Sequence, residues 1–221
     1  MAFDLPRFES EPVIGIIRGV KEESLEGVVE ASISGGLRFL EITLNTPNCF
    51  SLIKIISKNY PQLQIGAGTV LSVEEAKRAC AEGAQFIVAP NFDSGVASYC
   101  RDNNITYFPG ALTPTEIQTA WEAGATMVKI FPASQMGPNY FKQVKGPFDK
   151  IKLMAVGGVN PTNIKDYLGA GADAVALGGS IYSMQRMENK MFQEIQKDIE
   201  EFMFEVKNFY SKISSEGLKN R

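Results

Sequence analysis

The sequence predicts an α/β protein with the (β/α)8 or TIM barrel fold, in which eight parallel strands alternate with eight helices. Two observations predict it. Eight short apolar runs follow one another along the chain, and a junction that ends a helix with glycine and then begins a strand recurs four times. The length of 221 residues fits one barrel domain covering 1–221. A doubly wound parallel sheet is the alternative architecture.

The four junctions lie at Gly35, Gly83, Gly124 and Gly171. Glycine is common just beyond a helix because it accepts the left-handed conformation, so each one marks the passage from a helix to a strand. The strands expected after the junctions are LRFLEIT, AQFIVAP, ATMVKIF and ADAVALGG, and those expected between them are VIGIIR from Val13, LQIGAG from Leu63, ITYFPG from Ile105 and IKLMAVGG from Ile151. Their nearly continuous hydrophobicity is typical of parallel strands that are covered on both faces.

Amphipathic stretches at 72–82, 94–103, 115–123 and 162–168 predict helices between these strands. The segment 186–213 has helical periodicity in its Met, Ile and Phe residues and predicts a closing helix whose apolar stripe belongs to the core. The polar tail 214–221 is expected to be frayed. We expect no second domain and no linker.

The composition excludes several kinds of site. The chain has no histidine, which excludes a Ser/His triad and a His-ligated catalytic zinc and leaves acid–base chemistry to Glu, Asp, Lys, Tyr or water. A net charge of -3 with scattered Lys and Arg argues against nucleic acid as a partner. The sequence contains no membrane-length apolar stretch and no recognisable leader, and its three cysteines are widely spaced. We therefore expect a cytoplasmic protein with reduced thiols, no membrane partner and a small-molecule ligand.

The strand-end residues carry the expected chemistry, because barrel active sites lie at the carboxyl ends of the strands. Lys129 stands inside the apolar strand TMVKIF, where burial should lower the pKa of its amine and leave it a nucleophile toward ketones. Glu41 holds the matching place in LRFLEIT, and alternate strands share layers inside a barrel. A structural lysine at the strand end, or a buried ion pair between the two residues, is the alternative reading.

Two glycine pairs form a separate signal. Gly157-Gly158 closes the seventh expected strand and Gly178-Gly179-Ser180 closes the eighth, where backbone N–H groups can bind a phosphate. Arg18 ends the first strand and could bind a carboxylate or phosphate, and Thr69 offers one hydroxyl among small residues. Tight turns at the glycines and at Thr69, and a rim salt bridge at Arg18, are the structural alternatives.

These residues together resemble the family of 2-keto-3-deoxy-6-phosphogluconate (KDPG) and 4-hydroxy-2-oxoglutarate (KHG) aldolases. The resemblance runs nearly end to end, through IIRG, LRFLEITLNTP, IGAGTVL, GAQFIVAPN, FPGALTPTE, VKIFPAS, GPNYFKQVKGPF, VGGVNP and ALGGS. It implies a class I aldolase on a TIM barrel, free of metal and of organic cofactors, in which Lys129 forms an imine with the keto carbon. It further implies that Glu41 moves protons through a water molecule.

The same resemblance implies the binding roles and the assembly. Arg18 and Thr69 would bind the pyruvate carboxylate and neighbouring hydroxyls. The phosphate would be held by Gly157, Gly158, Gly179 and Ser180. Such enzymes are similar to one another in being homotrimeric, and the implied partner is a phosphorylated keto acid.

Two positions depart from the gluconate-type pattern and bear on the substrate. Asn45 stands where many such enzymes carry Arg, and Val156 stands in AVGG where they carry a Pro-Thr-Gly-Gly run. LNTP and AVGG resemble the 2-keto-3-deoxy-6-phosphogalactonate branch, whereas GALTPTE and KGPF resemble the gluconate branch. We expect cleavage of KDPG to pyruvate and glyceraldehyde 3-phosphate, together with KHG to pyruvate and glyoxylate. The galactonate epimer is the alternative substrate, with Asn45 and Val156 as the substrate-binding positions that would decide.

Two further hypotheses stay open at the level of sequence. The glycine pairs alone would also suit a phosphosugar epimerase or isomerase that does not use Lys129. A phosphosugar-binding protein without activity is the third reading.

Overall fold

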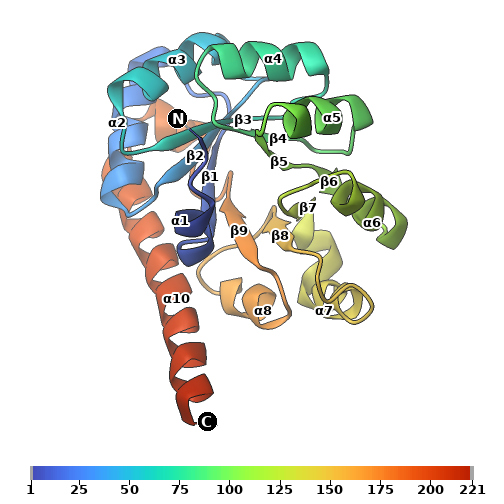
Figure 1. The fold of residues 1–221 in the computed structure, drawn as a ribbon. Coiled ribbons are helices and arrows are strands. Elements are labelled where there is room, and N and C mark those ends of the chain that lie inside the picture. Colours follow the sequence, from blue (N-terminus) through green and yellow to red (C-terminus); the bar gives the residue numbers. More distant parts are fainter. Residues whose placement is uncertain (1, 220–221) are drawn as a thin grey trace.

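Parallel strands in the computed structural model form a nearly closed barrel, which confirms the predicted fold (Figure 1). Residues 2–219 are described, and the side chains of residues 2–212. The described strands are β1 (Val13–Ile17), β2 (Phe39–Thr43), β3 (Gln64–Gly68), β4 (Phe86–Val88), β5 (Thr106–Phe108), β6 (Gly110–Ala111), β7 (Val128–Ile130), β8 (Leu153–Val156) and β9 (Ala174–Leu177). They pair in the order β5-β4-β3-β2-β1-β9-β8-β7-β6, so sequence neighbours are spatial neighbours, as in a barrel.

The fifth expected strand is divided at Pro109, and this division raises the expected eight strands to nine. Proline has no N–H to donate to a ladder, so the regular pairing stops there. β5 pairs with β4, with Phe86 opposite Thr106, whereas β6 pairs with β7, with Gly110 opposite Lys129. Lys129 N donates to Pro109 O at 2.8 Å across the same gap. The divided strand therefore joins the two ends of the sheet.

Helices surround the strands. The described helices are α1 (Leu5–Ser10), α2 (Glu22–Ser34), α3 (Cys49–Asn59), α4 (Val73–Ala81), α5 (Ser94–Asp102), α6 (Pro114–Glu122), α7 (Ala133–Lys145), α8 (Ile164–Gly169), α9 (Met184–Glu188) and α10 (Phe192–Lys219). The four predicted internal helices correspond to α4, α5, α6 and α8. The start of α6 is fixed by a capping box between Thr113 and Glu116. Gly83, Gly124 and Gly171 have φ of 105°, 101° and 101°, as expected at the junctions, but at the first junction the left-handed residue is Gly36 rather than Gly35.

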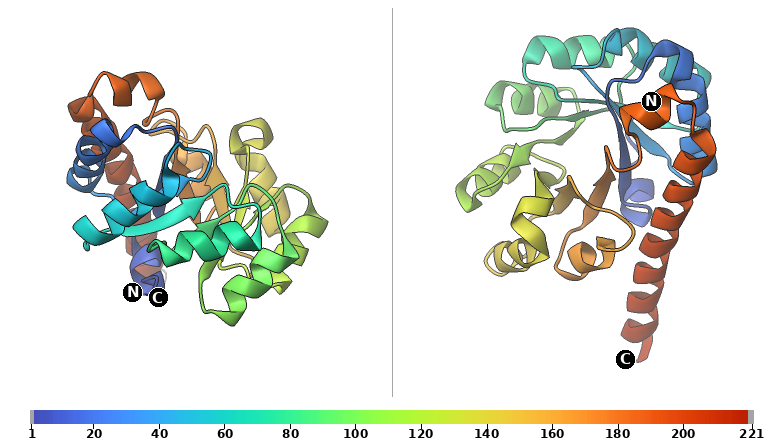
Figure 2. Two further views of the ribbon diagram at one scale, coloured as in Figure 1. Left: turned by 90° about the horizontal axis from the view of Figure 1, so that it is seen from above. Right: turned by 180° about the vertical axis from the view of Figure 1, so that it is seen from behind.

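The closing segment differs from the expected continuous helix over 186–213. It forms two helices, α9 and α10, because Lys190 between them adopts φ 53°, which ends α9. The backbone of α10 continues to Lys219, beyond the expected end at 213. The backbone of 214–219 in the expected frayed tail belongs to this helix, whereas residues 220–221 lie outside those described. α10 packs along α2 and extends past the barrel (Figure 1; Figure 2, right).

The core has two parts. One lies between the strands and the surrounding helices, and the other fills the barrel interior with Phe39, Phe86, Phe108 and neighbouring aliphatic side chains. The short helix α1 closes this interior at one end: Phe8 is fully buried, and its ring centroid lies 5.0 Å from that of Phe39 and 5.6 Å from that of Phe108. The amino-terminal segment thus completes the core, a role that the sequence analysis did not predict.

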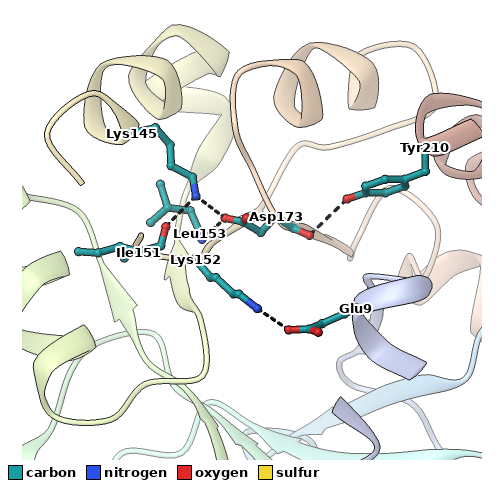
Figure 3. A network of polar contacts seen from close by, with 7 residues as sticks. All are labelled: Glu9, Lys145, Ile151, Lys152, Leu153, Asp173 and Tyr210. Carbon is teal, nitrogen blue, oxygen red and sulfur yellow. Dashed lines mark hydrogen bonds and ion pairs between the residues drawn. The ribbon is translucent and has the colours of Figure 1, made fainter. Parts of the chain in front are cut away.

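A polar network ties helices to the strands at their amino-terminal ends (Figure 3). The Asp173 carboxylate, just before β9, accepts hydrogen bonds from Lys145 Nζ and Leu153 N, each at 2.8 Å. Lys145 Nζ also donates to Ile151 O at 2.8 Å, and Tyr210 Oη of α10 donates to Asp173 O at 3.5 Å. The network therefore joins α7, β8, β9 and α10, at the end of the barrel that usually serves stability.

Candidate active site

A cavity of about 290 Å³ lies at the carboxyl ends of the strands. Several of its lining residues directly follow a strand: Arg18 follows β1, Thr69 follows β3, Phe131 follows β7 and Gly157 follows β8. The full lining is Ile16, Arg18, Thr69, Pro90, Lys129, Phe131, Val156, Gly157, Gly178, Gly179, Tyr182, Ser183 and Met184. The cavity thus occupies the position where this fold places its active sites.

Lys129 reaches this cavity from the middle residue of β7. Its side chain is 6% exposed, and its backbone is held by the pairing with Gly110 and Met154. The Nζ atom lies 5.4 Å from the centroid of the exposed Phe131 ring. Burial lowers the pKa of the Lys129 ammonium, because the charged form loses its hydration. The amine is therefore biased toward the neutral, nucleophilic form while its tip borders a ligand-sized space.

Glu41 is buried and is not among the residues that line the cavity. Its side chain is 1% exposed, and it comes from the centre of β2, between Ile16 of β1 and Gly66 of β3. The absence of a side chain at Gly68 makes the room for it, because a Cβ atom at Gly68 would lie 2.1 Å from Glu41 Oε1. The carboxylate position is thus set by a glycine on the neighbouring strand.

Glu41 and Lys129 influence each other electrostatically. Burial raises the pKa of the Glu41 carboxyl, while Lys129 and Arg18 oppose this rise. Among the charged groups, Glu41 has the largest effect on the Lys129 amine and raises its pKa, whereas Arg18 lowers it. The two side chains form no direct ion pair or hydrogen bond among the described contacts. The arrangement is an acid and an amine that are both biased toward neutrality and stand close enough to interact.

Glycine backbone forms another part of the cavity wall and the loops beside it. Gly157 and Gly158 have φ of 93° and 80°, which requires glycine-like backbone after β8. Their carbonyls are occupied: Gly157 O accepts from Ser134 N at 3.0 Å and Gly158 O accepts from Asn163 Nδ2 at 2.9 Å. The N–H groups of Gly158, Gly179 and Ser180 donate no hydrogen bond to another residue in the described part of the chain. These donors are therefore available to an anion.

The structure brings most of the predicted site residues together. Arg18, Thr69, Lys129, Val156, Gly157 and Gly179 line the cavity. Thr69 is half-buried and has φ 59°, a conformation that side chains rarely adopt outside constrained sites. Val156, 3% exposed, presents an aliphatic surface to the cavity and offers no hydroxyl.

Three predicted residues lie outside that lining. Asn45 is exposed in the turn between β2 and α3. In this turn Thr46 Oγ1 accepts from Gly19 N at 2.9 Å, which links the turn to the residue after Arg18. Gly158 is exposed at the rim, and Ser180 borders a separate cavity of about 450 Å³.

The segment after β9 also contributes to the cavity, which the sequence pattern did not predict. Tyr182, Ser183 and Met184 line the cavity, and Tyr182 Oη lies 2.8 Å from Ser32 Oγ in a buried contact. Ser183 accepts from Arg186 N at the start of α9. A Ser followed by a helical stretch is a cap signal, but the expected start of the closing helix at 186 placed these residues in a connecting loop.

The described residues contain no group of three or more Cys, Asp or Glu side chains arranged to hold a metal ion. Of the described helices, none combines the length and apolar character needed to cross a membrane.

Comparison with known proteins agrees with this geometry. A model of the KDPG and KHG aldolase family matches residues 6–198. The chain is 40% identical over 174 residues to the 2-dehydro-3-deoxy-6-phosphogalactonate aldolase of Escherichia coli K12, covering 77% of this chain and 84% of that protein. It is 34% identical over 177 residues to the 2-dehydro-3-deoxy-phosphogluconate aldolase of Treponema pallidum, covering 78% and 84%.

A solved structure is also similar. It is a KDPG aldolase from Legionella pneumophila with pyruvate captured as a covalent carbinolamine, and it matches with a TM-score of 0.81 and 27% identity over 87% of this chain and 94% of that one. The family match covers most of the chain and includes every strand that borders the cavity. The protein therefore belongs to the KDPG and KHG aldolase family and is a lyase.

Proposed function

We propose that Lys129 is the Schiff-base lysine and that the enzyme cleaves KDPG to pyruvate and glyceraldehyde 3-phosphate. One observation carries this proposal: a nearly buried amine of lowered pKa borders the cavity at the carboxyl end of the barrel, with the Glu41 carboxyl beside it. KHG is the second expected substrate, giving pyruvate and glyoxylate. The activity needs neither a metal nor an organic cofactor.

The reaction begins when neutral Lys129 Nζ attacks the C2 carbonyl and forms a carbinolamine. Loss of water, with protons carried by Glu41 through a bridging water, gives the iminium ion. The same carboxylate, through that water, accepts the proton of the C4 hydroxyl. The C3–C4 electron pair then moves into the iminium, which releases the aldehyde and leaves an enamine. Protonation at C3 and hydrolysis release pyruvate and restore the free amine.

The rest of the cavity and the adjoining loops after β8 and β9 would supply the binding groups. Arg18 and Thr69, near Lys129 in the lining, would bind the carboxylate and neighbouring hydroxyls. The phosphate would be bound by backbone N–H groups of Gly157, Gly158, Gly179 and Ser180. A Cβ atom at Gly179 would meet nothing within 4 Å, so packing inside the protein does not require glycine there. Close approach of a ligand to the backbone would require glycine at this position.

The galactonate epimer is a second candidate substrate, and Val156 favours it. Val156 gives the cavity an aliphatic surface and removes a hydroxyl that could distinguish the C4 configurations. Asn45 is exposed and does not line the cavity, so Arg18 and Thr69 would bind the carboxylate without it. We expect Val156→Thr to shift the ratio of kcat/KM for the two epimers toward KDPG. An unchanged ratio would exclude Val156 from stereochemical choice.

We also propose a homotrimer of single-domain subunits acting in the cytoplasm on a small phosphorylated keto acid. Support comes from the family pattern described above. Light scattering after gel filtration tests the assembly, and a monomer mass would contradict it.

Trapping with pyruvate and borohydride tests the proposed lysine. We expect one reduced adduct, mapped by mass spectrometry to Lys129, while half-buried Lys145 stays unmodified as the internal control. In parallel, a lactate dehydrogenase-coupled assay should report pyruvate release from KDPG, lost in Lys129→Ala. An adduct on another lysine, or pyruvate release by Lys129→Ala, would refute the assignment of Lys129. Conversion of a phosphosugar by Lys129→Ala without pyruvate release would favour an epimerase or isomerase.

A further inference from the structure

The loop after β8 contains a side chain that holds the expected phosphate donors in place. Gly158 has left-handed backbone, φ 80°, and is exposed at the cavity rim. Glycine in such a position has wide conformational freedom, so a binding site built on it needs external restraint. The structure provides that restraint on both sides of Gly158.

Each of the two peptide groups that flank Gly158 is hydrogen-bonded through its carbonyl. Gly157 O accepts from Ser134 N, at the start of α7, at 3.0 Å. Gly158 O accepts from Asn163 Nδ2, just before α8, at 2.9 Å. In a trans peptide the C=O and N–H groups point in opposite directions, so the N–H groups of Gly158 and Val159 are turned away from these two partners. Within the described chain neither N–H donates to another residue.

The Asn163 side chain is itself oriented by the backbone. Its Oδ1 accepts from Asn160 N at 2.9 Å, while its Nδ2 donates to Gly158 O. Since one partner is an obligate donor and the other an obligate acceptor, the amide can satisfy both in only one orientation. Ser134 contributes a backbone N–H, which substitution leaves in place, so Asn163 is the side chain on which the geometry of Gly158 depends.

We propose that Asn163 is a positioning residue for the substrate's phosphate group, acting through the Gly158–Val159 peptide. The inference rests on the proposed phosphate site and adds to it a residue that does not line the cavity. By holding the Gly158 carbonyl, Asn163 fixes the conformation of Gly158, whose own N–H is one of the expected phosphate donors, so its loss weakens binding of a phosphorylated ligand. Chemistry at Lys129, on β7, does not depend on it.

The test compares a phosphorylated substrate with an unphosphorylated one. In Asn163→Ala we expect the KM for KDPG and the inhibition constant of inorganic phosphate to rise by about tenfold, the effect of one lost hydrogen bond in a rigid site. The kcat for KDPG, the kcat/KM for KHG and the rate of pyruvate trapping should stay within about twofold. A structural defect would instead lower all of these together.

Two further variants keep the test decisive. Asn163→Asp keeps the acceptor for Asn160 N and replaces the donor to Gly158 O by a carboxylate oxygen that repels this carbonyl, so it should show the same selective loss even where Ala disturbs the loop. Thr162→Ala is the matched control, since it removes a hydroxyl that bonds Asn160 Oδ1 and does not touch Gly158. We expect it to behave as wild type.

The outcomes separate this inference from the proposed function. An unchanged KM for KDPG in folded Asn163→Ala and Asn163→Asp, or equal losses for KDPG and KHG, overturns the role of Asn163 alone. Wild-type protein that forms no Lys129 adduct refutes the proposed function. Wild-type protein that is not inhibited by phosphate and binds KDPG no better than KHG refutes the phosphate site, and this inference with it.

Discussion

Substitution of Gly68 by alanine should disable the enzyme by moving one carboxylate. The added Cβ would lie 2.1 Å from Glu41 Oε1 and 2.6 Å from its Cδ. Ordinary contact distances are about 3.5 Å, so the carboxylate must move by about 1 Å or more. Displacement of a catalytic group by about 1 Å can reduce a rate about a hundredfold, equivalent to about 2.7 kcal/mol. We expect kcat/KM for KDPG to fall by that factor.

The coupled assay for pyruvate release measures this loss, and controls identify its cause. Gly146→Ala is the matched glycine substitution, since its nearest contact would be Gln143 O at 3.3 Å, and it should keep full activity. In a Glu41→Asp background the shorter side chain withdraws by about 1.5 Å. Gly68→Ala should then reduce kcat/KM by less than about tenfold further. Wild-type activity in Gly68→Ala, or full additivity in the double variant, would refute the reasoning.

Three other substitutions test the remaining features. Because burial raises the pKa of Glu41 above 4.5, the folded state holds a proton that the unfolded chain releases, and stability declines as pH rises from 4.5 through the raised pKa. Glu41→Gln should therefore abolish turnover yet raise Tm at neutral pH by a few degrees, with a smaller gain at pH 4; a lower Tm at neutral pH would contradict this. Arg18 lowers the pKa of Lys129, so Arg18→Met should raise it and move the acidic limb of the pyruvate-trapping rate to higher pH, whereas an unmoved limb would dismiss the coupling. Lys145→Met breaks the network around Asp173 and should reduce the free energy of unfolding by about 1–3 kcal/mol in urea titrations with kcat unchanged; a matching drop in kcat would show that the two ends of the barrel are not independent.

The strands were predictable because strands buried on both faces consist almost entirely of apolar residues. Runs such as VIGIIR and ADAVALGG have no polar face, which is typical of parallel barrel strands. The division of the fifth strand was harder to predict, since Pro109 sits inside an otherwise suitable run, and only the pairing partners on either side reveal that each half serves a different neighbour.

Features that depend on tertiary context were missed. The helix α1 is six residues long and has no clear periodicity, and Phe8 is identified as core only once the barrel interior is known. The break between α9 and α10 rests on left-handed Lys190, a residue type that gives no warning of positive φ. Tertiary packing, rather than local propensity, decides both features.

The site was predictable to the extent that strand ends determine it. Lys129, Arg18 and Thr69 meet in one cavity because barrel topology brings strand ends together. Asn45 sits two residues beyond the end of β2, where turn geometry decides the direction of a side chain, and it lies exposed. The hydrogen bond from Asn163 to Gly158 O could not have been predicted, since it depends on how the loop after β8 folds and which of its carbonyls has no backbone donor.

The division at Pro109 affects where the barrel can open locally. Closure there depends on β5 and β6, which are three and two residues long, and on a proline that donates no backbone hydrogen bond. Local opening should be easiest at this seam, so amide protons of 106–111 should exchange with deuterium earlier than those of β1, β2 and β9. Glu41 and Lys129 stand on strands that the seam helps to keep at a fixed separation. Warming should therefore loosen the spacing of the reacting pair, and reduce turnover, at temperatures where the rest of the barrel is still folded.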